Sequence, residues 1–382
     1  MQFQKTLITI AAAFAFGAAS TTLFAAPITT EGVGVGKHGD IRVAVTFDNG
    51  KIQKIDILKN AENPVLAKKV FTDLKDQVAA ANSVQVDIVS GATFTSKGML
   101  DAIEDAAKKA GVTLGKADKK ALKAAVKDLP KNASYDVVVI GAGGAGFSAA
   151  IEAKNAGANV VLLEKMPQVG GNSLISGAEM NVARNWVQPK LGITDDSPEL
   201  HAKDTYLGGD KKGDMNVINV MTHNALAGAE WCRDYLGIRF EPDNLFFFGG
   251  HSRKRALIPV GHTGTEFITK FQAKADELGI PVITNMKAEE LIKDKSGRVV
   301  GVKATMNGAE YTFNAKGGVV LATGGFGANP AMVKKYNPKI DERFKTTDAP
   351  GTTGEALYMA QRAGAELVNM QYIQTLSLYT HL

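Results

Sequence analysis

The sequence has only one cysteine, Cys232, among its 382 residues. A single cysteine cannot form a disulfide within the chain, and it rules out a C-x-x-C-H haem site and a cysteine-rich iron–sulfur site here. The six histidines show no spacing typical of metal ligands, so we expect no metal site. Redox chemistry in this chain would therefore depend on organic cofactors.

Long apolar runs are also missing, apart from one near the N-terminus. Lys5 is followed by an alanine-rich apolar run over residues 7–19 and by small residues up to Ala26. This order is typical of a secretory signal peptide, here residues 1–26, and the run is too short to favour a membrane anchor. We expect an exported, soluble, periplasmic protein.

The formal net charge is +5, but the excess of positive charge is local. Residues 108–131 contain eight lysines against two aspartates. No aromatic residue interrupts this run, so a solvated linker is favoured over a nucleic-acid site. We place the linker at 113–132, between domains at 28–112 and 133–382, and the hydrophobic fraction of 45% suits globular domains.

The patterns in residues 28–112 predict a small α+β domain. Apolar and polar residues alternate over 41–47, the turn signal Asp48-Asn49-Gly50 follows, and a returning strand begins at 52–58. The remaining elements predicted for this domain are a helix at 67–78, a strand at 84–89 and a helix with Met99, Leu100, Ile103 and Ala107 on one face.

The most informative segment is YDVVVIGAGGAGFSAAIEAKNAGANVVLLEK, which begins at Tyr135. It predicts a buried parallel strand at 137–140, a helix at 147–156 and a second strand at 158–163. Between the first strand and the helix, glycines form the pattern G-x-G-x-x-G: Gly141, Gly143 and Gly146.

Each part of this segment has a physical role in dinucleotide binding. The first glycine makes the tight turn, the second lets the backbone approach a pyrophosphate, and the third lets helix and strand pack closely. The helix N-terminus offers free N–H groups to the phosphates. Glu164, at the end of the second strand, is placed to accept hydrogen bonds from ribose hydroxyls. An ordinary glycine-rich turn would not explain Glu164.

Further glycine turns favour FAD over NAD. A second turn, Gly170-Gly171-Asn172-Ser173, follows where the far side of an extended dinucleotide would pass. Residues 317–325 predict a buried return strand running into a glycine turn, and 351–355 form one more glycine loop. NAD-binding domains do not need these turns, so the fold predicted for 133–382 is a Rossmann-like FAD-binding domain.

Residues 87–93, Asp-Ile-Val-Ser-Gly-Ala-Thr, match the attachment signature of covalently flavinylated proteins. Residues 28–112 thereby resemble the FMN-binding domain of sodium-pumping and electron-transport flavoproteins. The resemblance implies that the Thr93 hydroxyl carries FMN through a phosphoester bond. The alternative is a plain Ser/Gly/Thr turn in which Thr93 caps a helix.

The glycine turns together resemble the secreted fumarate reductase/urocanate reductase flavoprotein family, over about residues 135–377. An FMN-binding domain before the FAD domain is like the urocanate reductase branch. Carried over by position, the resemblance implies FAD contacts at Ala145, Glu164, Asn172, Ser173, Gly177, Ala178, Ala288 and Glu355.

The family's activity implies an exported oxidoreductase that reduces the C=C bond of an unsaturated carboxylate. Electrons would pass from a membrane or periplasmic donor, such as a quinol-linked cytochrome, to FMN, then FAD, then substrate. A flavin transferase would attach the FMN. The alternatives are a fumarate or acrylate-type reductase and a non-catalytic flavin electron carrier.

Two departures from the family affect this interpretation. Where fumarate-reducing members have His-Pro after Tyr-Ile-Gln and one residue, Tyr372-Ile373-Gln374-Thr375 is followed by Leu376-Ser377, which argues against fumarate. The family's capping domain and its proton-donating arginine have no counterpart before Leu382, so we expect an incomplete FAD domain and assign no catalytic residue.

Three weaker candidates are interpreted structurally. The aromatic and basic run 246–255 is favoured as a core strand followed by a solvated turn, and His262 as a loop or capping residue. Cys232 is expected in a buried helix face. Ser176, Asp234 and His251 have no spacing typical of a nucleophilic triad.

Overall fold

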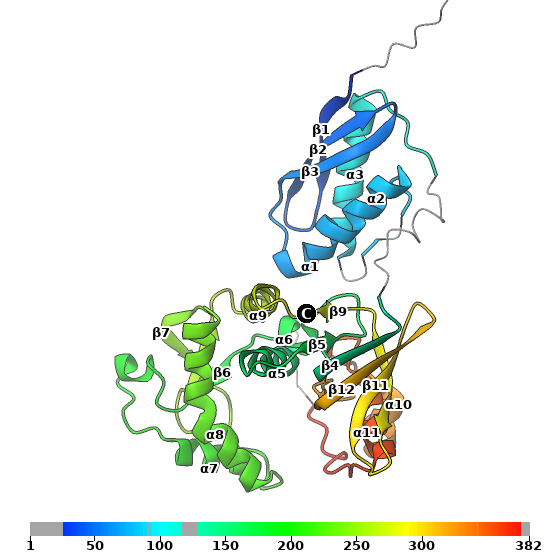
Figure 1. Ribbon diagram of the computed structural model, residues 1–382. Helices are drawn as coiled ribbons and strands as arrows, with labels where there is room; N and C mark the ends of the chain where they lie inside the picture. Colours follow the sequence, from blue (N-terminus) through cyan, green and yellow to red (C-terminus); the bar gives the residue numbers. More distant parts are fainter. Residues whose placement is uncertain (1–25, 87, 90–91, 117–128, 342, 376–382) are drawn as a thin grey trace, which may run out of the picture.

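The computed structural model describes residues 26–375 except 87, 90–91, 117–128 and 342. The described residues leave out residues 1–25 of the predicted signal peptide, most of the lysine-rich linker, Leu376 and part of the attachment signature (Asp87, Ser90 and Gly91). The described chain forms two α/β units that follow one another in sequence (Figure 1).

The first unit is an antiparallel sheet with helices on one face. Its strands are β1 (Ile28–Val35), β2 (Asp40–Asp48) and β3 (Lys51–Lys59), in that order. Asn49 and Gly50 both have positive φ, which gives the predicted tight turn between β2 and β3. The alternating residues Ile41, Val43, Val45 and Phe47 of β2 are buried, as their pattern predicted.

β1 was not predicted, because two glycines weaken its strand pattern. Gly32 and Gly34 lie directly against α3 (Thr93–Lys109), and a Cβ at either would come within 2.0 Å of a carbonyl oxygen of that helix. These glycines therefore let strand and helix pack backbone to backbone. Met99, Ile103 and Ala107 of α3 are buried in the same core.

The helix predicted at 67–78 is present in three consecutive pieces: α1 (Pro64–Lys69), a π-helical turn (Val70–Leu74) and α2 (Lys75–Ala81). The strand predicted at 84–89 is wrong. Its apolar side chains pack on the core, but side-chain hydroxyls bind the backbone there: the Gln85 amide donates to Ser83 Oγ (3.0 Å) and the Val89 amide to Ser96 Oγ (3.1 Å).

The second unit contains a six-stranded sheet in the order β10-β11-β12-β4-β5-β9. Strands β4 (Asn132–Ile140), β5 (Val160–Leu163), β9 (Val282–Ile283) and the end of β12 (Ala309–Leu321) run parallel. β10 (Lys287–Lys293) and β11 (Val299–Met306) are antiparallel additions. The two strands and the return strand predicted from the sequence are thus present. The burial expected for the return strand is not: Val320 and Leu321 at its end are 36% and 39% exposed.

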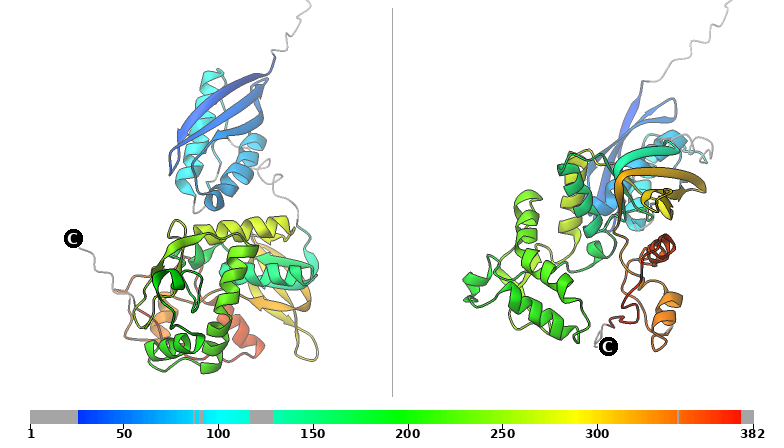
Figure 2. Two further views of the ribbon diagram at one scale, coloured as in Figure 1. Left: turned by 90° about the vertical axis from the view of Figure 1, so that its left-hand side faces the viewer. Right: turned by 60° about the horizontal axis from the view of Figure 1, so that its bottom comes forward.

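Helices cover one face of this sheet. α5 (Gly144–Asn155) follows β4 directly and packs against α9 (Thr265–Glu277) (Figures 1 and 2). Phe147 of α5 stacks on Phe271 of α9. Ile140 pairs with both Leu163 and Leu321, so three parallel strands end level with one another. Ligands of parallel sheets bind at this carboxyl edge.

The rest of the second unit consists of shorter elements. A small sheet is formed by β6 (Met180–Asn181), β8 (Ala256–Pro259) and β7 (Phe240–Phe246), next to α7 (Pro198–Gly208) and α8 (Met215–Glu230). The remaining elements are α6 (Gly171–Ile175), α10 (Pro330–Tyr336), α11 (Glu355–Ala363), a 3-10 turn (Gln188–Leu191) and a π-helical turn (Trp231–Tyr235). Over the described residues, no helix combines the length and apolarity needed to span a membrane.

Candidate functional site

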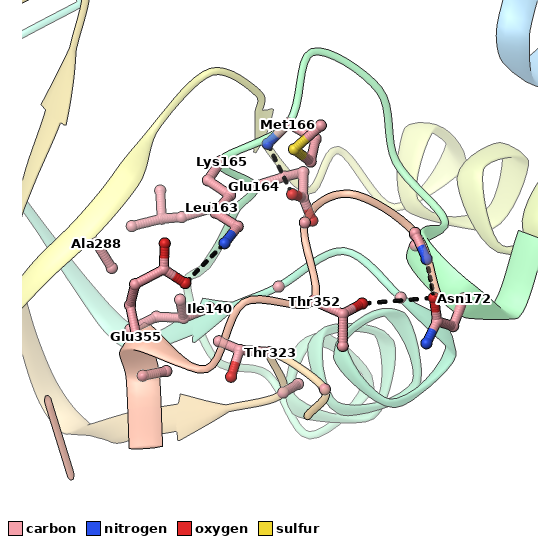
Figure 3. Close-up of a pocket in the computed structure, with 18 of the residues that line it drawn as sticks. Ile140, Leu163, Glu164, Lys165, Met166, Asn172, Ala288, Thr323, Thr352 and Glu355 are labelled. Atoms are coloured by element: carbon pink, nitrogen blue, oxygen red, sulfur yellow. Dashed lines mark hydrogen bonds and ion pairs between the residues drawn. The ribbon is translucent and has the colours of Figure 1, made fainter. Parts of the chain in front are cut away.

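A cavity of about 700 Å³ lies at the carboxyl ends of β4, β5 and β12 (Figure 3). It is lined by three separate stretches of the chain: residues 140–175, 286–288 and 321–360 contribute to it. These stretches include the glycine turns that were predicted to contact FAD. The sheet therefore brings distant segments to one site.

The three glycines of the G-x-G-x-x-G pattern have different reasons to be glycine. A Cβ on Gly141, whose φ is +101°, would lie 2.4 Å from the Ala322 oxygen, and one on Gly146 would lie 1.8 Å from the Gly141 oxygen. The fold itself requires those two. Gly143 has φ −88° and faces the cavity, and its Cβ would make only ordinary contacts at 3.8 Å. Only something bound in the cavity would require glycine at 143.

Glu164 is held rigidly at the cavity wall. One carboxylate oxygen accepts the Ala142 amide hydrogen and the other accepts that of Met166, both at 2.8 Å, and the residue is buried. Each oxygen keeps a second lone pair, so a ribose hydroxyl can still donate to it. The predicted acidic residue thus also fixes the first glycine turn.

The second glycine turn, residues 170–173, is hydrogen-bonded to two other segments at the rim of the cavity. The Asn172 amide oxygen accepts the Ala349 N–H (2.6 Å), and its Nδ2 donates to Asp348 (2.6 Å). Ser173 Oγ accepts the Gly144 N–H at 3.1 Å, next to the first turn. The turn therefore joins the start of α5 to the loop before α11 (Figure 3).

Glu355 and Lys165 form an ion pair at the opposite rim, with 2.9 Å between Nζ and Oε2. Burial raises the pKa of the Glu355 carboxyl, but hydrogen bonds from Thr353 and Lys165 outweigh it and lower this pKa to about 2. Glu355 is therefore an anion at neutral pH.

Most of the residues predicted to bind FAD, from the glycine motif or from the resemblance, line this cavity: Gly141, Gly143, Ala145, Glu164, Asn172, Ser173, Ala288 and Glu355. Gly146 packs beneath the turn, and Gly177 and Ala178 lie in the loop after α6, outside the lining. Met166, Thr323, Asp348 and Thr352 also line it and were not among the predicted residues. Thr323 and Thr352 each adjoin a glycine of these turns, which is the signal that could have found them, whereas Met166 and Asp348 adjoin none.

A second cavity, of about 280 Å³, lies in the first unit around Thr93. It is lined by Lys37, His38, Glu62, Asn63 and residues 92–95. α3 begins at Thr93, and Ala92 occupies the N-cap position. The alternative in which Thr93 caps the helix is therefore not what the structure shows, and the start of a 17-residue helix favours a phosphate there.

A buried carboxylate organises this small cavity. Glu62 Oε1 accepts the His38 N–H at 2.8 Å, and Oε2 accepts the Thr95 hydroxyl hydrogen. Burial raises the pKa of Glu62, but the hydrogen bonds from Thr95 and His38 outweigh it, and the pKa falls below its ordinary value. Glu62 thus joins the loop before β2 to the start of α3.

The weaker candidates have structural roles, with one correction. Cys232 is buried, and burial raises the pKa of its thiol to about 11. His262 lies in an exposed loop, 3.7 Å from Glu241. The run 246–255 is not the core strand that was expected, because Phe246 and Phe247 are 46% and 50% exposed. The turn that follows is largely solvated as predicted, but Arg255 at its end is fully buried and paired with Asp196 and Asp204, both at 2.7 Å. The two carboxylates compensate its charge, which allows this burial.

Among the described residues, one cavity at the carboxyl edge of a parallel sheet and another at a helix start that carries a hydroxyl are what a two-domain flavoprotein needs. The profile of the FAD binding domain family matches residues 136–378, and that of the FMN-binding domain matches residues 36–108. The chain belongs to the FAD binding domain family and also contains an FMN-binding domain.

Similar proteins include reductases of unsaturated carboxylates. Urocanate reductase of Eggerthella lenta is 42% identical over 90% of this chain and 57% of its own length. NADH:acrylate oxidoreductase of Vibrio harveyi is 32% identical over 89% of this chain and 40% of its own length. The chain thus spans a little more than half the length of the first relative and less than half the length of the second.

Solved structures agree on the fold of the second unit. The open conformation of a flavocytochrome c3 fumarate reductase superposes with a TM-score of 0.58 at 32% identity, covering 66% of this chain and 44% of that one. The 3-ketosteroid-Δ4-(5α)-dehydrogenase of Rhodococcus jostii RHA1 gives 0.59 at 28% identity, covering 64% and 56%.

The residues present fit the two cofactors of these families. Gly143 leaves open the space that a pyrophosphate needs, and Glu164 keeps acceptor capacity toward a ribose. In the small cavity, Lys37 and His38 share the lining with the Thr93 hydroxyl. Basic side chains beside a hydroxyl at a helix start suit a phosphoester.

Proposed function

We propose that this protein takes part in the flavin-dependent reduction of the C=C bond of an unsaturated carboxylate, with urocanate as the first choice. FMN bound covalently at Thr93 would pass electrons to FAD in the large cavity. The observation that carries the proposal is the presence of both cavities in one chain, as the two matched domains require.

In the large cavity the protein's part is to hold FAD and to orient it. The backbone at Gly143 and the N-terminus of α5 would hold the pyrophosphate, and Glu164 would accept a hydrogen bond from the ribose. FAD, when bound, supplies the hydride chemistry. Among the described residues no arginine lines this cavity, so the proton donor is not assigned to any residue of the chain.

Two observations support urocanate over fumarate. The urocanate reductase of Eggerthella lenta shares 42% identity over almost the whole chain, including the FMN-binding part. After Tyr372-Ile373-Gln374, this sequence has Leu376 in place of the histidine of the fumarate-reducing pattern. Acrylate and fumarate remain the second candidates, because reductases of both are also similar.

The partners and the location belong to the same proposal. The N-terminal pattern supports export to the periplasm, where a membrane or periplasmic donor, such as a quinol-linked cytochrome, would reduce the FMN. A flavin transferase would form the bond to Thr93.

The test measures oxidation of reduced viologen by the flavin-loaded protein after addition of urocanate, fumarate or acrylate. The chain is assayed alone and fused to the C-terminal part of the Eggerthella lenta enzyme. We expect the fused protein to oxidise viologen fastest with urocanate. If viologen reduces both flavins but no enoate accelerates its oxidation, the proposal is wrong and an electron carrier is favoured.

A further inference from the structure

One face of the first unit lies against the second unit (Figures 1 and 2). It comprises Asn63, Val65, Lys68 and Lys69, at and within α1, and we call it the docking face. Its partners are Thr265 and Asp276 of α9 and Thr284 after β9.

The docking face combines three polar contacts with one apolar anchor. Asn63 Nδ2 donates to Thr265 Oγ1 (3.2 Å), Lys68 Nζ pairs with Asp276 Oδ2 (2.6 Å), and the Lys69 ammonium donates to the Thr284 hydroxyl. Val65 is only 8% exposed and belongs to the apolar cluster under the six-stranded sheet. The contact is therefore specific in both position and chemistry.

The docking face joins the two cavities through very few residues. Asn63 lines the small cavity that contains Thr93, and it binds Thr265. Thr265 follows Gly264, which packs so tightly on Ser173 that a Cβ would lie 1.5 Å from the Ser173 oxygen. Ser173 in turn lines the large cavity.

A second connection starts from Lys69. Its partner Thr284 follows Ile283, whose carbonyl accepts the Glu164 N–H at 2.8 Å. Glu164 is part of the large cavity's wall. Both ends of the docking face thus reach the wall of the large cavity through directly bonded or packed neighbours.

The ion pair of this contact is exposed to solvent. The side chains of Lys68 and Asp276 are 44% and 54% exposed, and ion pairs this exposed contribute little to stability. Contacts between domains of one chain commonly open and close unless they are large and hydrophobic.

We propose that the docking face is a reversible, salt-sensitive contact through which the FMN-bearing unit delivers electrons to the FAD-bearing unit. The inference rests on the proposed function. In the transfer, reduced FMN loses two electrons and FAD gains two, and the accompanying protons are exchanged with water. No bond of the protein forms or breaks.

The first experiment tests the contact without any flavin. A carbodiimide joins an amine and a carboxylate into an amide with loss of water, so it should link Lys68 to Asp276 in the unmodified chain, as peptide mass spectrometry can show. Lys303 and Glu290 are the matched control: they are 2.8 Å apart, similarly exposed at 57% and 56%, and within one unit.

We expect both links at low salt. At about 1 M salt, where the Debye length is about 3 Å, the Lys68–Asp276 link should fall about fivefold more than the control. If Lys303–Glu290 links form and Lys68–Asp276 links do not, the docking face is not a contact in solution. If salt reduces both links equally, the contact is not reversible in the way proposed.

The second experiment uses the flavin-loaded chain. Lys68→Asp places two like charges at the contact, so transfer from FMN to FAD, followed by absorbance after rapid reduction, should slow about tenfold. Lys68→Asp with Asp276→Lys should restore it, and Lys303→Asp should have no effect. An unchanged transfer rate in Lys68→Asp, with both flavins still bound, would overturn the proposal. Absence of FMN from the wild-type chain would instead count against the proposed function, and the carbodiimide result would still decide the contact.

Discussion

The large and small cavities are built from different parts of the chain. The large one collects turns from three distant stretches and presents many backbone groups along its length. The small one is formed by three short segments around a single buried carboxylate, Glu62. A long cavity can retain an extended dinucleotide through many weak contacts, whereas a small one offers few. We therefore expect contacts alone to hold FAD in the large cavity and a covalent bond to hold FMN in the small one.

The largest effect is expected where the large cavity depends on its open backbone. Gly143→Val fills space that only a bound cofactor needs, so it should weaken FAD binding about a hundredfold, or about 3 kcal/mol, and leave the FMN unchanged. Titration of the chain with FAD measures this. Gly249→Val is the control, because Gly249 is exposed and a Cβ there meets nothing. Equal FAD affinity in both variants would show that the large cavity is not the FAD site.

A smaller effect is expected at Glu164. Glu164→Gln keeps the shape but removes the charge that accepts two backbone N–H groups and faces the ribose position. Loss of a charge-assisted hydrogen bond costs about 1.5–3 kcal/mol, so FAD affinity should fall roughly tenfold or more. The same titration measures it, and an unchanged affinity would place the ribose elsewhere.

The small cavity should respond at Glu62. Glu62→Gln leaves the contacts of Thr95 and His38 without their anionic acceptor, so the first unit should lose about 1–3 kcal/mol of unfolding free energy in urea. The exposed Glu31→Gln should change it by less than about 0.5 kcal/mol. If both variants unfold alike, the carboxylate does not organise the cavity. FAD binding should be normal in both.

The smallest effect concerns acid stability at the rim of the large cavity. The pKa of Glu355 is lowered to about 2 from 4.5. Its contribution to the free energy of unfolding is therefore complete above pH 4.5 and is lost as pH falls toward 2. Because Glu355 is largely exposed, we expect a difference of less than about 1 kcal/mol. Unfolding between pH 5 and pH 2 should be less pH-dependent in Glu355→Gln than in the exposed control Glu366→Gln. Identical slopes would contradict the ion pair with Lys165.

The sequence predicted the parts of the fold whose patterns are local. The alternation over 41–47 and the glycine pattern at 141–146 correspond directly to β2 and to the turn after β4. The strand expected at 84–89 failed because Ser83 and Ser96 bind its amides, which alternation alone cannot show. β1 was missed because its glycines serve contact with α3 rather than strand propensity.

In the candidate sites too, only the residues that belong to a local sequence motif could be predicted. Residues in motifs, such as Gly143, Glu164 and Thr93, could be singled out because each motif carries its own chemistry. Glu62 and Asp348 could not, because they reach the cavities only through folding of distant segments. Arg255 was placed in a solvated turn because its partners Asp196 and Asp204 lie more than fifty residues away.

The central claim is that one flavin is bonded to the chain at Thr93 and the other is held only by contacts. The most direct measurement is to denature the loaded protein, produced in a host with a flavin transferase, and to identify the flavin that stays with the chain and the flavin released. We predict that FMN stays and FAD is released, that Thr93→Ala retains no flavin, and that Thr95→Ala retains FMN. FMN still bonded to the Thr93→Ala chain, or no flavin bonded to the wild-type chain, would contradict the account.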